Sequence, residues 1–174
     1  MKNGKAIHLI LLLILLLTQG LFVQAQNSKT LTKPTYSIKY PATWEVQTGS
    51  NNTGFTINSP TDGDGDSYTE FIDLTVNALN DAAMTAEQYA IFSKGYLPSK
   101  IPKFKVLESK KLTQNKDGYY YVFTGLQNGK PCKWKQCYFV KNLKVYIITY
   151  TAEAIKYDSY KAIVDPMIAS FLVK

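Results

Sequence analysis

Arginine is absent from this sequence, and histidine is nearly absent. Its one histidine is His8, in the apolar N-terminal segment, and all 20 Lys/Arg positions are lysine. Beyond residue 25 the chain has no histidine, which excludes Ser-His-Asp and Cys-His catalysis, a histidine general base and histidine-ligated zinc. Without arginine, the chain lacks the side chain that recognises phosphates and base edges through paired hydrogen bonds, so we expect no nucleic-acid partner. An enzyme built on this chain would need carboxylates, lysines, tyrosines or a lone cysteine.

Cysteine is also scarce. The two cysteines, Cys132 and Cys137, fall on one predicted strand, where a rise of ~3.3 Å per residue separates them by about 16 Å. A disulfide needs Cα atoms within about 7 Å, so we expect two semi-buried free thiols. A local bulge that lets the two meet is the alternative. No cysteine precedes Cys132, so we expect no lipoprotein anchor at a cleavage site.

The only long apolar run lies at the start of the chain. Residues 1–25 have the layout of a secretory signal peptide, with Lys2 and Lys5, then an apolar run over 7–17, then Val23-Gln24-Ala25 as a small-residue cleavage site. We expect cleavage before Gln26 and an exported protein, periplasmic or secreted, without a transmembrane span after cleavage. A retained anchor helix is the alternative, but the run is short of the ~20 residues that cross a bilayer.

The rest of the chain is long enough for one domain with a sizeable core. We expect residues 26–35 to be a flexible N-terminal segment and residues 36–174 to form a single domain. Residues 1–25 carry two lysines and no acid, so their removal takes the net charge from +7 to +5. A lysine-only surface of this kind is typical of a solvated exterior.

Residues 119–151 form the centre of the predicted fold, as three antiparallel strands. Asn128-Gly129 is a strong signal for a two-residue hairpin turn, because both positions tolerate positive φ. If Gln127 faces Lys130, Phe123 faces Trp134 on the same side of the sheet. Both faces of these strands are apolar, and such strands are normally covered on both sides, so we expect helices above and below.

Two helices are predicted outside this meander. Thr85 and Gln88 form a capping-box pattern that starts the first helix at Ala86. We expect its apolar stripe to face the core; the stripe consists of Tyr89, Phe92, Tyr96 and Leu97. The second helix closes the chain with a wide apolar face between Tyr157 and Phe171, and Pro166 should kink it or break its hydrogen-bond ladder.

The most chemically suggestive segment is the acidic loop that contains Asp62, Asp64 and Asp66. Alternating carboxylates can converge on Ca²⁺, and these three occupy positions one, three and five of an EF-hand-like loop. The match then ends, because Ser67 replaces the usual glycine, Asp73 replaces the usual glutamate and the flanks read as strands. The alternative is an acidic hairpin loop that is only solvated.

The order of these segments resembles the PsbP-like superfamily, which includes exported bacterial DcrB-like domains. The resemblance spans nearly all of residues 36–172 and lies in the order and spacing of its motifs. These are Tyr40-Pro41-Ala42-Thr43-Trp44, Glu70 before Phe71–Val76, Lys105–Ser109, Asn128-Gly129-Lys130-Pro131, Tyr138-Phe139-Val140, Tyr146–Thr151 and Ser170-Phe171.

The resemblance implies an α+β fold, an α/β/α sandwich around an antiparallel sheet, usually without enzymatic activity. In this superfamily, PsbP of plants and cyanobacteria is an extrinsic subunit of photosystem II that helps retain Ca²⁺ and Cl⁻. A related eukaryotic protein binds a small GTPase in nuclear transport, and DcrB-like proteins belong to the cell envelope. No residues that carry the PsbP or GTPase-binding roles match positions of this chain.

The leading functional hypothesis is an exported, non-enzymatic binding or accessory protein of the cell envelope. It would bind another protein or a cell-surface component through sheet edges and loops. The alternatives are a Ca²⁺-responsive module that uses Asp62, Asp64 and Asp66, and a photosystem II-type extrinsic subunit in a photosynthetic host. A peripheral contact with an anionic membrane surface, through Lys133, Lys135 and Lys141, is a further possibility.

Overall fold

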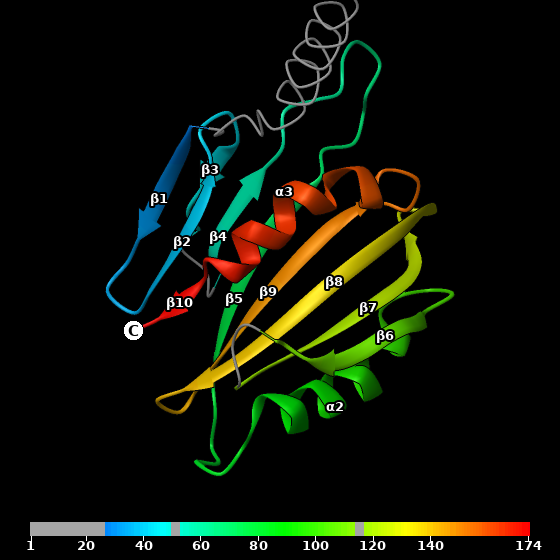
Figure 1. Ribbon diagram of the computed structural model, residues 1–174. Helices are drawn as coiled ribbons and strands as arrows, with labels where there is room; N and C mark the ends of the chain where they lie inside the picture. Colours follow the sequence, from blue (N-terminus) through cyan, green and yellow to red (C-terminus); the bar gives the residue numbers. More distant parts are fainter. Residues whose placement is uncertain (1–26, 50–52, 114–116) are drawn as a thin grey trace, which may run out of the picture.

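A seven-stranded antiparallel sheet forms the centre of the computed structural model, which describes residues 27–49, 53–113 and 117–174 (Figure 1). The strand order is β3-β4-β5-β9-β8-β7-β6, and every neighbouring pair is antiparallel. The strands are β3 (Glu45–Gln47), β4 (Thr53–Asn58), β5 (Phe71–Ala78), β6 (Lys105–Lys111), β7 (Gly118–Gln127), β8 (Lys130–Lys141) and β9 (Lys144–Glu153).

The β7–β8 hairpin has the predicted turn and register. Asn128 and Gly129 adopt φ values of 51° and 80°, and Gln127 pairs with Lys130. Phe123 pairs with Trp134, and both side chains lie in the same buried cluster. The prediction that a tight turn at this point sets the register of the aromatic rows is therefore confirmed.

The next turn settles a register that the sequence left open. Lys141 pairs with Lys144, so the connection from β8 to β9 is a two-residue turn made by Asn142 and Leu143. Both residues have positive φ, 53° and 57°, which matches the twist of a tight hairpin.

Helices cover both faces of the sheet, as expected. Helix α2 (Ala86–Tyr96) lies on one face and α3 (Tyr157–Ala169) on the other (Figure 1). The core under α2 contains Tyr121 and Phe123, and the core under α3 contains Tyr120 and Ile148. This arrangement is the predicted α/β/α sandwich, with a short 3₁₀ turn, η2 (Leu97–Ser99), after α2.

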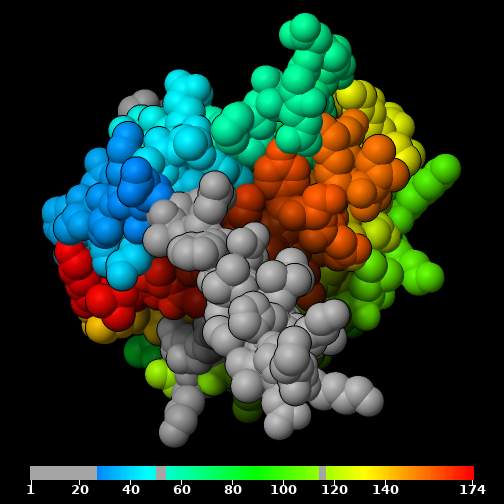
Figure 2. All heavy atoms as spheres, turned by 45° about the horizontal axis from the view of Figure 1, so that its top comes forward, coloured from blue at the N-terminus to red at the C-terminus, as the bar shows by residue number. Residues whose placement is uncertain are grey.

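A second, three-stranded sheet lies beside α3, and the sequence did not predict it. Its strands are β1 (Ser28–Thr32), β2 (Tyr36–Pro41) and β10 (Leu172–Val173), in the order β1-β2-β10. In Figure 2 the red C-terminal strand lies against the blue strands of the N-terminal segment. Tyr36 and Ile38 are buried in the same core that α3 covers.

The prediction that residues 26–35 form a flexible segment is wrong for half of its length, which forms strand β1. Residues from Ser28 to Thr32 pair along β2, where Leu31 faces Ile38. The segment is polar and exposed, so its hydrophobic pattern is weak. Its order comes from backbone hydrogen bonds to β2, a partner that the pattern of a single segment does not reveal.

Helix α2 begins as predicted but packs differently. The capping box between Thr85 and Gln88 is formed at both of its contacts. The prediction that the large stripe faces the core is wrong for Phe92 and Tyr96, which are 70% and 56% exposed. The fully buried positions are Ala86 and Ala90, because small side chains let the helix approach a sheet face crowded with tyrosines.

The remaining sequence predictions concern Pro166 and the cysteines. Pro166 does not end helix α3, which continues past it to Ala169.

Cys132 and Cys137 are buried free thiols in different cores, on opposite faces of the sheet. Burial raises the pKa of Cys137 to about 12, so this thiol stays protonated and unreactive at neutral pH. The predicted signal peptide lies outside the described residues.

Candidate functional site

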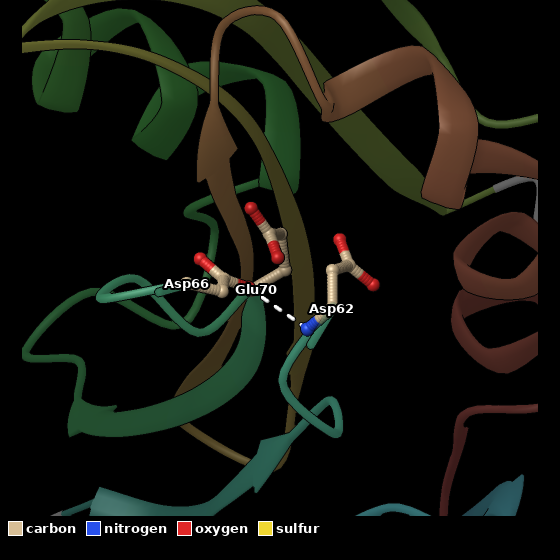
Figure 3. Close-up of side chains that lie close together, drawn as sticks. All are labelled: Asp62, Asp66 and Glu70. Carbon is tan, nitrogen blue, oxygen red and sulfur yellow. Dashed lines mark hydrogen bonds between the residues drawn. The ribbon is translucent and has the colours of Figure 1, made fainter. Parts of the chain in front are cut away.

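An acidic cluster lies where the β4–β5 loop meets β5. Asp62 and Asp66 come from the loop, and Glu70 directly precedes Phe71, the first residue of β5 (Figure 3). One carboxylate oxygen from each of the three lies within 4.8 Å of the others. Asp64, which the sequence placed with Asp62 and Asp66, is exposed and outside this group.

The loop holds Asp66 in place through its own backbone. Oδ2 of Asp66 accepts a hydrogen bond from the backbone NH of Asp62 at 2.9 Å, and Oδ1 accepts one from the NH of Tyr68 at 3.1 Å. Gly63 and Gly65 make the bend possible, since their φ values are 104° and 94°. The hydrogen bond from Asp62, with help from the Lys156 ammonium group, lowers the pKa of Asp66 to about 2.

Lys156 brings a positive charge to the cluster from the turn between β9 and α3. Its Nζ lies 3.1 Å from Oδ2 of Asp62 and 2.9 Å from Oδ2 of Asp66. In Figure 2 the β4–β5 loop, in blue-green, stands out from the surface next to the orange segment where α3 begins. The bonds to both carboxylates raise the pKa of Lys156, chiefly through Asp66.

Tyr160 of α3 contacts the same loop. Its hydroxyl donates a hydrogen bond to Oδ1 of Asp62 at 2.6 Å. This bond, followed by the one from Lys156, lowers the pKa of Asp62. Tyr160 also packs edge-on against Trp44, with ring centroids 6.0 Å apart, so the cluster is connected to the core beneath it.

Glu70 is the buried member of the cluster and the one that the sequence missed. It is 0% exposed, and among the described residues neither of its carboxylate oxygens has a well-formed hydrogen bond. The buried hydroxyl of Ser59 is in the same position, and the Ser59 NH donates to the Glu70 carbonyl at 2.8 Å. Burial raises the pKa of Glu70, which the nearby ammonium of Lys156 partly offsets. In the sequence, the only indication of this role is that Glu70 is an acidic residue at the start of an apolar strand.

A second candidate surface is the outer face of α2, which we define as Ile91, Phe92 and Tyr96. The three side chains are 59%, 70% and 56% exposed. Phe92 and Tyr96 lie about 200° and 240° around the helix from buried Ala90, at ~100° per residue. The outer face of α2 therefore points away from the sheet.

The three lysines considered for an anionic surface are engaged within the chain. Lys133 pairs with Asp158 at 3.3 Å, and Lys135 pairs with Asp165 at 2.7 Å. Nζ of Lys141 donates to the Val173 carbonyl at 3.2 Å. Their charges are thus partly satisfied by neighbours on α3 and β10. Within the described ranges, no helix combines the length and hydrophobicity that a membrane crossing requires.

Comparison with known proteins finds similarity of fold only. Neither protein-family models nor curated proteins match the sequence. Solved structures match its fold, over 86–88% of this chain and 95–96% of theirs. They include cyanobacterial PsbP (CyanoP) from Synechocystis (11% identity, TM-score 0.58), the Ran-binding protein Mog1p from Saccharomyces cerevisiae (9%, 0.60), and LpqN from Mycobacterium tuberculosis, involved in cell envelope biogenesis (11%, 0.59).

At identities this low, the structural match establishes a common architecture. It does not transfer a ligand, a partner or an activity to this chain. The element order, the antiparallel sheet and the helices on its two faces agree with the resemblance that the sequence motifs indicated. The chain has the fold of the PsbP-like proteins.

Proposed function

We propose that this protein is exported and acts as a non-enzymatic binding protein of the cell envelope, or of the secreted fraction. The signal-peptide layout of residues 1–25 supports export. The lack of histidine beyond residue 25 supports a binding role over catalysis, because the common nucleophile–base pairs depend on that residue. The fold is shared with LpqN, a protein involved in cell envelope biogenesis, and with Mog1p, a Ran-binding protein.

The observation that carries this proposal is the outer face of α2. Exposed aromatic side chains next to one another are typical of protein-binding surfaces, where tyrosine and other aromatics contribute most of the affinity. The ring of Phe92 also packs against the ring of Tyr89 on the same helix, with centroids 6.0 Å apart. A scattered single apolar residue, such as Ile155 at 87% exposure, needs no such explanation.

The charges around this face indicate the chemistry of the partner. Nζ of Lys100 lies 5.1 Å from the centre of the Tyr96 ring, so one positive charge borders this face. An apolar face with a lysine at its edge fits a partner that offers an apolar pocket with an acidic side chain beside it. We therefore expect a protein partner to bind here, and not through the paired lysines of β8.

Native gel electrophoresis of extracts from the source organism tests this function. The tagged wild-type protein should migrate in a complex larger than the monomer, and a Phe92→Ser, Tyr96→Ser variant should migrate as the monomer. Ile155→Ser is the control, since it removes an even more exposed apolar side chain elsewhere, and it should leave the complex intact. Co-migration of all three proteins would remove the basis for a binding role of α2.

A further inference from the structure

We propose that Asp62, Asp66 and Glu70 bind a divalent cation of the hard, oxygen-preferring class, with Ca²⁺ the favoured ion. In the structure the ammonium group of Lys156 lies at two of these carboxylates, and the metal would displace it. This inference is independent of the binding role of α2.

The spacing of the oxygens fits a shared ion. One oxygen from each carboxylate lies within 4.8 Å of the other two. Oxygens that bind Ca²⁺ lie about 2.3–2.6 Å from it, so two ligands on opposite sides of the ion are about 4.6–5.2 Å apart. The three carboxylates therefore already lie within the span of one coordination sphere.

The buried Glu70 side chain points to a ligand independently of the acidic loop. A fully buried carboxylate is normally paired, hydrogen-bonded or bound to a metal. Glu70 is 0% exposed, and its two oxygens lack a well-formed hydrogen bond in the described part of the chain; the backbone NH groups of Glu70 and Glu153 offset the effect of burial on its pKa only in part. Lys156 forms its ion pairs with Asp62 and Asp66, and no ion pair with Glu70 is present among the described residues. A bound cation would supply the partner that Glu70 lacks.

The donor set selects the kind of metal. The cluster offers only carboxylate oxygens, and the backbone of Ser59, whose NH donates to the Glu70 carbonyl, places a buried hydroxyl beside it. Oxygen donors without thiolate or imidazole suit Ca²⁺, Mg²⁺ or Mn²⁺ and disfavour zinc. Two ligands lie on a loop whose bends depend on Gly63 and Gly65. Such a loop suits the irregular, adaptable coordination of Ca²⁺ better than the strict octahedron of Mg²⁺.

Lys156 provides the sharpest test, because it is both a structural partner and a competitor. If the cluster serves only as an ion-pair network, removal of the ammonium group should weaken the structure and produce no metal binding. If the cluster binds a cation, Lys156→Met removes a competing positive charge and should increase the affinity for Ca²⁺. The two roles therefore predict different responses to the same substitution.

Calorimetric titration of the purified protein with CaCl₂, and separately with MgCl₂, measures this directly. We expect one Ca²⁺ per chain, tighter than Mg²⁺, with affinity reduced by about tenfold or more in Glu70→Gln. Lys156→Met should bind Ca²⁺ several-fold more tightly than the wild type. Asp64→Asn is the matched control, since Asp64 belongs to the same loop but lies outside the cluster, and it should bind as the wild type does.

Thermal unfolding with and without Ca²⁺ shows whether each variant is folded and whether the metal stabilises it. Ca²⁺ should raise the midpoint of the wild type and of Lys156→Met, and have little effect on Glu70→Gln. Absence of binding heat at millimolar Ca²⁺ in both the wild type and Lys156→Met would overturn the proposal. Equal losses in Asp64→Asn and Glu70→Gln would also overturn it, because they would indicate only a diffuse effect of loop charge.

Discussion

Phe123 and Trp134 stack with nearly parallel rings across the β7–β8 hairpin, with ring centroids 5.3 Å apart and ring planes 17° apart. They are directly opposite in register and are 1% and 6% exposed. A slip of one residue would place the two rings on opposite faces of the sheet. The stack therefore depends on the tight turn at Asn128 and Gly129.

Phe123→Ala should destabilise the protein strongly, by about 3–5 kcal/mol, because it removes a buried ring and leaves a cavity. Phe92→Ala makes the same chemical change at a position that is 70% exposed, and it should alter the free energy of unfolding by no more than about 0.5 kcal/mol. Urea denaturation of the two variants measures the difference. Similar losses would contradict the assignment of Phe123 to the core and Phe92 to the surface.

Gly125 should not tolerate a side chain. A Cβ atom there would lie 2.3 Å from Cγ2 of Ile101 and 3.0 Å from the carbonyl oxygen of Pro102, which accepts a hydrogen bond from Leu126. We expect Gly125→Ala to cost about 1–3 kcal/mol of stability through overpacking.

Gly95 provides the control for Gly125. A Cβ atom at this position in α2 meets nothing within 4 Å. Gly95→Ala should therefore stabilise the protein by about 0.5–1 kcal/mol, because alanine loses less backbone entropy in a helix. Thermal unfolding should shift in opposite directions for the two variants, and a shift of the same sign in both would refute the packing described for β7.

The hairpin was predictable because its information is local. Asn128-Gly129 limits the turn to one geometry, and period-two alternation then places Phe123 and Trp134 on one face. The capping box at Thr85 and Gln88 is local in the same way. Features of this kind depend on a few adjacent residues and survive in any fold that includes them.

The acidic cluster was only half predictable because it depends on the path of the chain. Spacing alone placed Asp64 with Asp62 and Asp66, whereas the bends at Gly63 and Gly65 leave Asp64 in solvent. Glu70 belongs to the cluster because it is buried at the position directly before β5. Lys156 is distant in the sequence, and it reaches the loop only once β5 and β9 have paired.

The outer face of α2 was misassigned for a related reason. Helical periodicity identifies an apolar stripe, but the neighbouring sheet decides which stripe fits against it. Tyr138 projects from the sheet under the helix, and its hydroxyl donates to Ser93 at 2.8 Å. With such large residues below, the face with Ala90 packs inward and Phe92 points outward.

Asp73 should make the stability of the protein depend on pH. It lies on β5 between Thr56 and Thr149, is partly buried, and has no ion-pair partner among the described residues. Burial raises the pKa of Asp73 from 3.8 to about 7. Between these values the folded state keeps a proton that the unfolded state has released, so the free energy of unfolding falls as pH rises and levels off above about 7.

Asp73→Asn removes this titration, so the variant should gain stability relative to the wild type as pH rises from about 4 to 7, by on the order of 3 kcal/mol. Urea denaturation of both proteins across that range measures the difference, and other titrating groups cancel in the comparison. A constant difference across the range would show that Asp73 ionises in the folded protein as it does in the unfolded chain.

The predicted signal peptide should be removed during export. We expect the mature protein to begin at Gln26 and to lack residues 1–25, which intact mass measurement of the exported protein detects. Leu13→Lys places a charge in the apolar run and should leave the uncleaved precursor inside the cell. Recovery of the full-length chain from the exported fraction would instead favour a retained N-terminal anchor.

Photo-crosslinking in living cells tests the proposed function most directly. A photoreactive residue at position 92, which is 70% exposed on the outer face of α2, should capture one discrete protein, and the product should disappear in Tyr96→Ser. The same residue at position 155, which is 87% exposed on the β9–α3 turn, should not capture that protein. Equal capture from both positions, capture of only a second copy of this chain, or no product at position 92 would contradict a partner-binding role for α2.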